Sequence, residues 1–184
     1  MERGTSCEGF GLDYHHGNLS SYQLLLATQL GDRAAFLELI QTYDAMVMRV
    51  ALTLTSSEAA AQEIYCQVFR DAFTSTTTLG AGSSVFIWLY RILVRHCLEY
   101  CRRSSGAGLS AVDDDPVPTM ARALLVLAPL DRMVFHLKHS QRLKIRTLSE
   151  IFDAPPEFII TTLQNAIRHL RIQLKIAPDP QGRG

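Results

Sequence analysis

The sequence predicts an all-α protein made of two small helical domains joined by a flexible linker. Strand signals are nearly absent, apolar residues recur at steps of three and four, and one internal segment is rich in Gly, Ser, Pro and Asp. We divide the chain into a disordered N-terminal segment, a first domain, an acidic linker, a second domain and a disordered tail, at 1–20, 21–103, 104–119, 120–176 and 177–184. With 184 residues, 47% of them hydrophobic, each domain can bury a modest core.

The first domain is expected to contain four helices. A short helix at 22–30 leads to a turn in which Asp32 is the predicted N-cap of a helix at 33–54. The apolar face of that helix consists of Phe36, Ile40, Tyr43, Val47, Val50 and Leu54. Ser and Thr residues then precede a third helix at 58–73, and residues 74–84 are a loop by composition.

The fourth helix, at 85–103, has an apolar side and a cationic side. Arg91, Arg95 and Arg102 lie away from the stripe of Val85, Leu89, Ile92, His96 and Tyr100. The cationic side is either a solvated face, with arginines paired to Glu99 or to acidic residues of the same domain, or a phosphate-binding surface. The uncharged Thr/Gly/Ser loop beside it and the persistent charge of arginine favour phosphate binding.

The second domain is expected to carry a helix-turn-helix. Pro129 divides residues 121–139 into two short helices, and Asp153 and Pro155 mark a tight turn between a short helix and a longer one. The small Ser149 allows these two helices to approach closely. One apolar stripe follows the longer helix: Ile159, Leu163, Ala166, Ile167, Leu170 and Leu174.

The two halves of the chain differ in charge. The formal net charge is zero, but residues 1–118 hold 8 Lys and Arg against 13 Asp and Glu, giving −5, while 119–184 hold 10 against 5, giving +5. Cations flank the helix-turn-helix on both sides: Arg142, Lys144 and Arg146, then Arg168, Arg171 and Lys175. Because such cations hold phosphates beside the groove, they favour DNA reading over a packing motif.

Several function classes find no support in the sequence. No window approaches the roughly 20 apolar residues of a membrane span, and the N-terminus lacks a signal peptide, so we expect a cytoplasmic protein without membrane insertion. No phosphate-binding glycine loop, GxSxG or HExxH is present, and we predict neither catalysis nor a cofactor. The cysteines, Cys7, Cys66, Cys97 and Cys101, form no CxxC and are interpreted as reduced thiols without a metal.

The order of these parts resembles the extracytoplasmic-function class of the sigma-70 family of RNA polymerase sigma factors. The matching stretches between residues 22 and 175 are GDRAAFLELIQTYDAMVMRVA, EAAAQEIYCQVFRDAF, SSVFIWLYRILVRHCLEYCRR, ALLVLAPLDRMVFHLK and LSEIFDAPPEFIITTLQNAIRHLRIQL. The resemblance implies a region-two helical domain, a linker and a region-four helix-turn-helix domain. It also implies a non-catalytic subunit that binds core RNA polymerase and directs promoter-specific transcription initiation.

The resemblance assigns roles to particular residues. Core polymerase would be bound by Glu63, Gln67, Val68, Phe69 and Arg70. The loop before Trp88 would capture a flipped base of the promoter element nearest the start site, and the backbone of that DNA would be held by Arg91, Arg95, Arg102 and Arg103. The helix-turn-helix would bind the more distant element through Lys144, Arg146, Phe158, Thr161, Thr162, Asn165 and Arg168.

The sequence departs from the family pattern at partner-facing positions. The core-binding helix has Glu63, Cys66 and Gln67 where an acidic residue, glutamine and another acidic residue are usual. In place of GTVKSRL the chain has EFIITTL, so Glu157 replaces the glycine, and Ile160 and Thr162 replace basic residues. Since each lost base contact costs about 1–3 kcal/mol, we predict divergent or weak recognition of the distant element.

Two alternatives remain open from the sequence. A sigma-like interaction module or regulator that has lost part of its promoter reading fits the changed contact positions and the zero net charge. A thiol sensor or metal protein would use Cys66, Cys97 and Cys101 on neighbouring helices. An anti-sigma protein is a partner suggested by the resemblance alone.

Overall fold

The structure, a computed structural model, describes residues 14–79, 83–104 and 120–174. Every regular element in these ranges is helical, which confirms the predicted all-α class. The helices are α1 (Tyr14–Gln29), α2 (Arg33–Thr55), α3 (Glu58–Thr74), η1 (Thr76–Thr78, a 3-10 turn), α4 (Val85–Ser104), α5 (Met120–Val126), α6 (Pro129–His139), α7 (Ile145–Phe152) and α8 (Pro156–Gln173).

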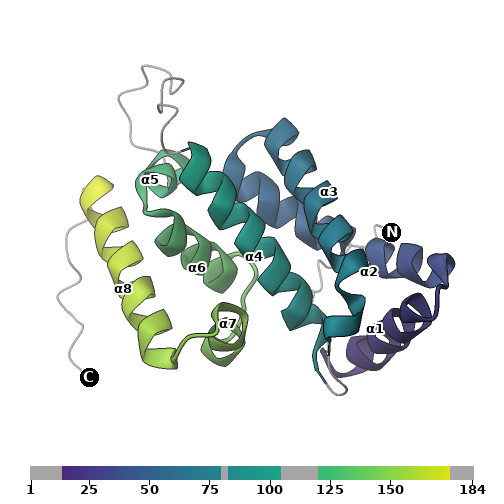
Figure 1. Ribbon diagram of the computed structural model, residues 1–184. Helices are drawn as coiled ribbons and strands as arrows, with labels where there is room; N and C mark the ends of the chain where they lie inside the picture. The colour runs from purple at the N-terminus through teal and green to yellow at the C-terminus, as the bar shows by residue number, and fades with distance from the viewer. Residues whose placement is uncertain (1–13, 80–82, 105–119, 175–184) are drawn as a thin grey trace, which may run out of the picture.

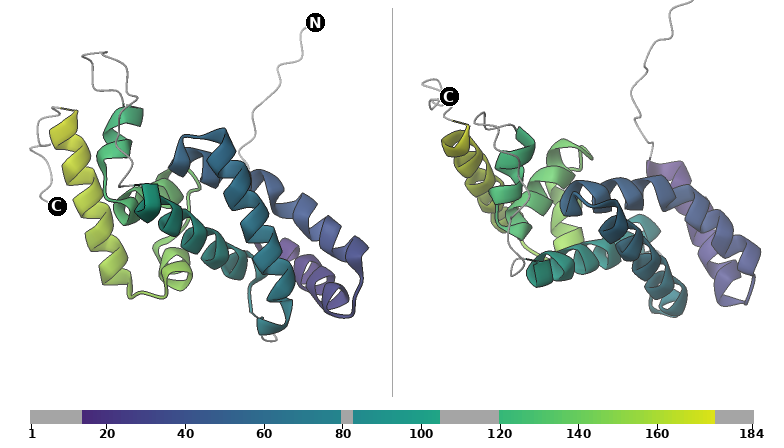
Figure 2. Two further views of the ribbon diagram at one scale, coloured as in Figure 1. Left: turned by 45° about the horizontal axis from the view of Figure 1, so that its top comes forward. Right: turned by 90° about the horizontal axis from the view of Figure 1, so that it is seen from above.

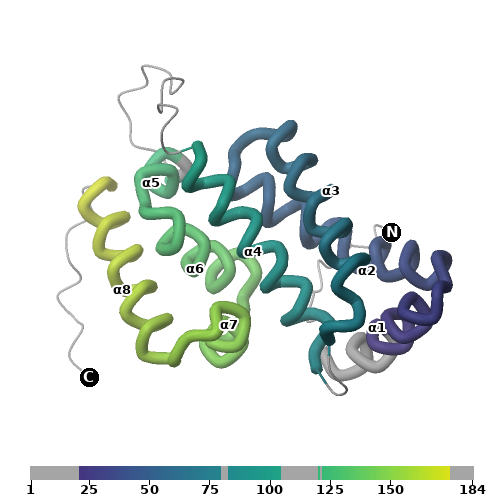
Figure 3. The backbone as a smooth tube through the Cα atoms, viewed as in Figure 1, coloured from purple at the N-terminus to yellow at the C-terminus, as the bar shows by residue number. Residues whose placement is uncertain are grey.

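Helix α4 runs through the middle of the molecule (Figure 1). It contacts α1, α2 and α3 on one side and α6 and α7 on the other. Helix α8 packs against α5, α6 and α7 and lies on the outer side of that group, as the further views in Figure 2 show. The tube in Figure 3 follows the chain from α1–α3 through α4 to α5–α8, which places α4 between the first helices and the last.

The predicted helix starts are confirmed where side chains cap them. The carboxylate of Asp32 accepts hydrogen bonds from the backbone N–H groups of Ala34 and Ala35 at 2.9 and 3.2 Å and so satisfies two free donors of α2. Ser57 accepts from the N–H of Ala60 at 3.4 Å at the start of α3. Pro129 stands at the first position of α6, where its missing N–H has no helical partner to lose.

The first helix begins earlier than predicted. Residues 14–20 were expected to belong to a disordered segment but form the start of α1. Because adding residues to an existing helix costs far less than starting one, the packed half of α1 can carry a polar extension that composition alone does not reveal. Residues 1–13, 105–119 and 177–184, which the other disorder and linker predictions concern, lie outside the described residues.

One buried cluster extends through both predicted domains. It joins Leu39, Val47, Leu89 and Leu93 of α2 and α4 to Met133, Leu137, Leu148 and Ile159 of α6–α8. A smaller cluster of Ala123, Leu127, Ala166 and Leu170 attaches α5 to α8. The two halves of the chain therefore share apolar contacts in this structure. Among the described residues, no helix has the length and apolar character needed to span a membrane.

Candidate nucleic-acid interface

Helix α4 has the two-sided character that its sequence predicts. Its buried face includes Val85, Leu89, Leu93 and Cys97, which are 0–1% exposed. The side chains on its other side are solvent-exposed: Arg91, Arg95, Arg102 and Arg103. Arg102 and Arg103 lie in the last turn, where cations interact favourably with the negative end of the helix dipole.

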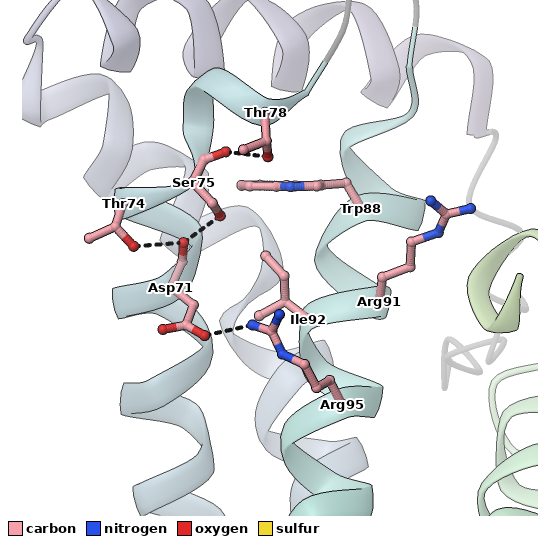
Figure 4. A pocket seen from close by; sticks show the side chains of 8 residues that line it. All are labelled: Asp71, Thr74, Ser75, Thr78, Trp88, Arg91, Ile92 and Arg95. Atoms are coloured by element: carbon pink, nitrogen blue, oxygen red, sulfur yellow. Dashed lines mark hydrogen bonds and ion pairs between the residues drawn. The ribbon is translucent and has the colours of Figure 1, made fainter.

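A cavity of about 650 Å³ opens between the C-terminal end of α3, η1 and the first half of α4. Figure 4 shows the flat ring of Trp88 crossing it below Thr78, with Asp71 and Arg95 facing each other from the two long helices. Hydroxyl groups form the η1 side of the cavity, and the Thr78 hydroxyl donates to the Ser75 carbonyl at 2.7 Å. An aromatic wall, hydroxyl groups and two arginines suit a nucleobase attached to a phosphate chain.

Asp71 is a charged residue of this cavity that sequence reasoning did not single out. Arg95 Nη2 lies 2.6 Å from Asp71 Oδ2, and His96 Nε2 lies 2.9 Å from the same oxygen. The side chains of Arg95 and Asp71 are 61% and 37% exposed, so water screens this ion pair. The carboxylate nevertheless offsets the charge of Arg95 at the place where a phosphate would bind.

Arg91 points away from the cavity in Figure 4 and is bound to the other half of the chain. Its Nε and Nη2 donate to the carbonyl oxygen of Glu150 at 2.9 and 2.7 Å. Glu150 lies in the last turn of α7, whose carbonyl groups lack partners within the helix and carry its partial negative charge. Arg91 therefore satisfies a free carbonyl of the helix-turn-helix.

Pairing of Arg91 and Arg95 with Glu99, one option of the solvated-face alternative, is not among the contacts found in the described residues. Arg95 instead follows the other alternative, pairing with an acidic residue of the same domain, while Arg91 reaches α7. No spacing along α4 indicates either partner, because both lie on other helices.

The helix-turn-helix forms with the turn that its sequence predicts. Asp153 adopts the left-handed conformation with a φ of 50° at the end of α7, and Pro156 opens α8. The N–H of Ala154 donates to the Ser149 carbonyl at 3.1 Å and closes the turn. Leu148 and Ile151 of α7 and Ile159 of α8 are buried, so the two helices form one unit.

Most of the predicted DNA-binding side chains of this unit are accessible. Lys144 is exposed at the start of α7, and Arg146, with its side chain 91% exposed, pairs with Glu150 at 3.2 Å. On α8, Phe158 and Thr161 are exposed. Arg168 is also exposed and donates to the Oδ1 of the half-buried Asn165 at 3.0 Å.

Thr162 differs from the other predicted DNA-binding residues of α8. It is 5% exposed, and its hydroxyl donates to the Phe158 carbonyl at 2.8 Å. Its side chain packs in the interior side of α8 and is not presented at the surface. The helical periodicity of the sequence indicates this burial, because Thr162 falls beside Ile159 and Ala166 on the apolar stripe.

The predicted polymerase-binding residues of α3 fall into two groups. Glu63, Gln67 and Arg70 share the outer face, where Gln67 Nε2 donates to Glu63 Oε1 at 3.0 Å. Val68 and Phe69 are 0% and 6% exposed and belong to the core. Direct contact with a partner is thus open to the three polar residues, while the two apolar ones hold α3 in place.

Within the described ranges, Cys66, Cys97 and Cys101 do not form part of a metal site. No group of three or more His, Cys, Asp or Glu side chains suited to a metal was found in the described part of the chain. Cys66 is exposed, whereas Cys97 and Cys101 are buried in α4. Burial, with a smaller contribution from Cys101, raises the pKa of Cys97 to about 12, so this thiol stays protonated and unreactive at neutral pH.

Comparison with known proteins finds RNA polymerase sigma factors among the relatives of this chain. No protein-family model matches the chain. The chain is 31% identical over 143 residues to the ECF RNA polymerase sigma factor SigM of Mycobacterium tuberculosis, a match that covers 74% of this chain and 69% of SigM. It is 22% identical over 139 residues to the RNA polymerase sigma factor SigV of Bacillus subtilis, covering 68% of this chain and 82% of SigV.

Solved structures share the fold at lower identity. The sigma factor RpoE of Bartonella quintana, solved with the anti-sigma factor NepR, matches 78% of this chain and 98% of its own with a TM-score of 0.61 and 18% identity. CnrH, solved with the cytosolic domain of CnrY, matches 86% of this chain and 99% of its own with a TM-score of 0.67 and 14% identity.

Proposed function

Because the chain belongs to the ECF RNA polymerase sigma factors, we propose that α3, α4 and the α7–α8 pair divide its contacts between core polymerase and promoter DNA. A sigma factor joins core RNA polymerase and directs promoter-specific initiation, and that is the function of this chain. We place it in the cytoplasm, as a non-catalytic subunit.

Core polymerase binds the outer face of α3. Glu63, Gln67 and Arg70 lie three to four residues apart and so share one stripe, on which Glu63 and Arg70 are exposed and Gln67 is half-buried. The buried Val68 and Phe69 contribute by fixing the helix on the core, not by touching polymerase. Cys66 on the same stripe places a weakly hydrogen-bonding thiol where a glutamine amide is usual in the family.

The promoter element nearest the start site binds α4 and the cavity beside it. Trp88 offers a flat ring for stacking an unpaired base, and the hydroxyl oxygens of Thr74, Ser75 and Thr78 can bind its polar edge. Arg91 and Arg95 bind the phosphates on either side once they leave Glu150 and Asp71. Single-stranded promoter DNA therefore competes with contacts inside the protein.

The distant element binds the α7–α8 unit. Its second helix enters the major groove, and cations before α7 and late in α8 hold the flanking phosphates. An anti-sigma protein, as found on RpoE, is a further proposed partner.

The observation that carries this proposal is the joint placement of Trp88 and Arg95 in one cavity of α4, with Arg91 at its edge on the same helix. The test mixes the purified chain with sigma-free core polymerase from the same source, follows co-elution on a sizing column, and measures opening of a cognate promoter by permanganate reactivity. The double variant Arg91→Ala/Arg95→Ala should co-elute and fail to open the promoter. Arg33→Ala/Arg49→Ala, which removes two exposed arginines of α2, is the matched control and should open it normally.

A different outcome would remove the assignment. Normal opening by the α4 double variant would show that this face does not hold promoter DNA. Failure of the unaltered chain to co-elute with core polymerase would instead favour a sigma-like interaction module.

A further inference from the structure

The outer face of α8 carries no cation over its first three turns. Residues 156–167, PEFIITTLQNAI, contain neither Arg nor Lys, and the first cation is Arg168, which donates to Asn165. Arg and Lys are the usual partners of guanine, whose O6 and N7 they bind together in the major groove. The part of α8 that would enter the groove therefore lacks the side chains for reading guanine.

Apolar groups occupy this surface instead. Phe158 and Ile160 are 44% and 42% exposed near the N-terminal end of α8. The exposed Thr161 donates its hydroxyl proton to the Glu157 carbonyl at 2.8 Å, so its methyl group is the part left to face a partner. Thymine is the base that presents a methyl group in the major groove, and Phe and Thr methyl groups are its usual apolar contacts.

Amide side chains continue the same surface. Gln164 is exposed one turn after Thr161, and Asn165, which is half-buried and accepts from Arg168 through its Oδ1, follows it. Both residue types suit the N6 and N7 atoms of adenine. Glu157 can accept from an amino group such as cytosine N4 but cannot donate to guanine O6 or N7.

Cations lie at the two ends of this surface. Lys144 and Arg146 are exposed at the start of α7, and Arg168 and Arg171 are exposed toward the end of α8. Positive charge on both flanks fits phosphates on both sides of a groove and carries no sequence information. The charge distribution thus favours duplex DNA as the occupant of the apolar surface between them.

We propose that α8 reads adenine–thymine pairs, with Phe158 and Thr161 contacting thymine methyl groups, and that it does not read guanine. This inference rests on the proposed function, in which α7–α8 binds the distant promoter element. Ile160 and Thr162 replace basic residues of the family pattern, and the inference is that this replacement alters which bases α8 reads. Thymine contact would replace guanine contact as the source of specificity, while the flanking cations would still hold phosphates.

The test uses the full chain with core polymerase. Duplexes are selected from a library with a randomised window, and their affinities are measured by fluorescence anisotropy. We expect an A·T-rich window in which replacing thymine by deoxyuracil, which removes only the methyl group, weakens binding about tenfold when both proposed methyl contacts are lost. Replacing guanine by 7-deazaguanine should leave the affinity unchanged. The opposite pattern, sensitivity to 7-deazaguanine and none to deoxyuracil, would overturn the inference.

Variants assign the effect to α8. Phe158→Ala should remove most of the sensitivity to deoxyuracil, while Ile172→Ala, a matched truncation of a 65% exposed residue near the other end of α8, should retain it. Sensitivity unchanged in Phe158→Ala would contradict the assignment. A chain that co-elutes with polymerase but enriches no duplex would overturn the inference about α8 and leave the proposed polymerase binding intact. A chain that does not co-elute would overturn both the proposed function and the inference.

Discussion

Arg91 on α4 donates two hydrogen bonds, from Nε and Nη2, to the carbonyl oxygen of Glu150 in α7, at 2.9 and 2.7 Å. The pair links the proposed phosphate-binding face to the helix-turn-helix. A guanidinium that donates to this carbonyl has to leave it before the same atoms can bind a phosphate. In the arrangement described here, the two proposed DNA-binding units are thus coupled through one arginine.

Replacing Arg91 separates its two roles. Arg91→Lys should keep most of the affinity for promoter DNA, because a lysine still contacts phosphate, but it loses the paired donors that reach Glu150. Arg91→Ala should lose both and reduce the slope of log K against log salt by about one. Hydrogen exchange of residues 145–152 should accelerate in both variants. Exchange unchanged in both would mean that the Arg91–Glu150 contact does not hold α7.

Asp71 is predicted to restrain DNA binding by α4. Asp71→Asn removes a negative charge 2.6 Å from Arg95 while keeping the shape of the side chain, so Arg95 gains freedom to bind phosphate. We expect severalfold tighter binding of single-stranded promoter DNA by anisotropy at low salt, with the difference shrinking as salt rises. Glu99→Gln, the same charge change at an exposed position of α4, is the control. Equal effects of the two substitutions would show only a general charge effect.

Helical periodicity and capping residues predicted the fold well because both are local. Asp32, Pro129 and Asp153 act on their own helix ends, so the starts of α2 and α6 and the end of α7 follow from a few neighbouring residues. The start of α1 at Tyr14 was missed because extension of a helix depends on the stability of the part already packed.

The candidate site was predicted in outline only. Arg91 and Arg95 were identified by their common side of α4, but their partners Glu150 and Asp71 come from packing between helices distant in sequence. Thr162 was assigned from a family motif although its place on the apolar stripe buries it. Residue type and spacing predict on which side of a helix a side chain lies. Which charged side chains are neutralised depends on tertiary contacts.

Thiol accessibility offers a test of the sensor alternative. In a Cys7→Ala background, Cys66 should react at once with a water-soluble disulfide reagent because it is exposed. Cys97 and Cys101 should react only on unfolding, since both are buried and burial raises the pKa of Cys97 to about 12. Rapid labelling of all three thiols in native protein, followed by loss of promoter opening, would support a thiol sensor.

His136 should make the stability of the protein depend on pH. The residue is 5% exposed in α6, its Nε2 has no hydrogen-bond partner among the described residues, and burial lowers its pKa to about 4 from the ordinary 6.5. Between these values the unfolded chain binds a proton that the folded chain does not, so the free energy of unfolding falls as the pH falls. We expect a loss of about 2 kcal/mol between pH 7 and pH 5 from this residue, measured by urea unfolding.

The variant His136→Leu isolates the effect. It should unfold at the same or a higher urea concentration at pH 7, because an apolar side chain replaces a buried group whose Nε2 is unsatisfied, and it should lack the His136 part of the loss at pH 5. Asp131, whose pKa is raised chiefly by burial, acts in the opposite direction but is present in both proteins and cancels in the difference. His139→Leu, at an exposed position of the same helix, should keep the full pH dependence. Equal loss of stability in the His136→Leu and unaltered proteins between pH 7 and pH 5 would contradict this prediction. It would mean that His136 binds its proton equally well in the folded and unfolded states, so that water reaches it where α6 packs against α2 and α4.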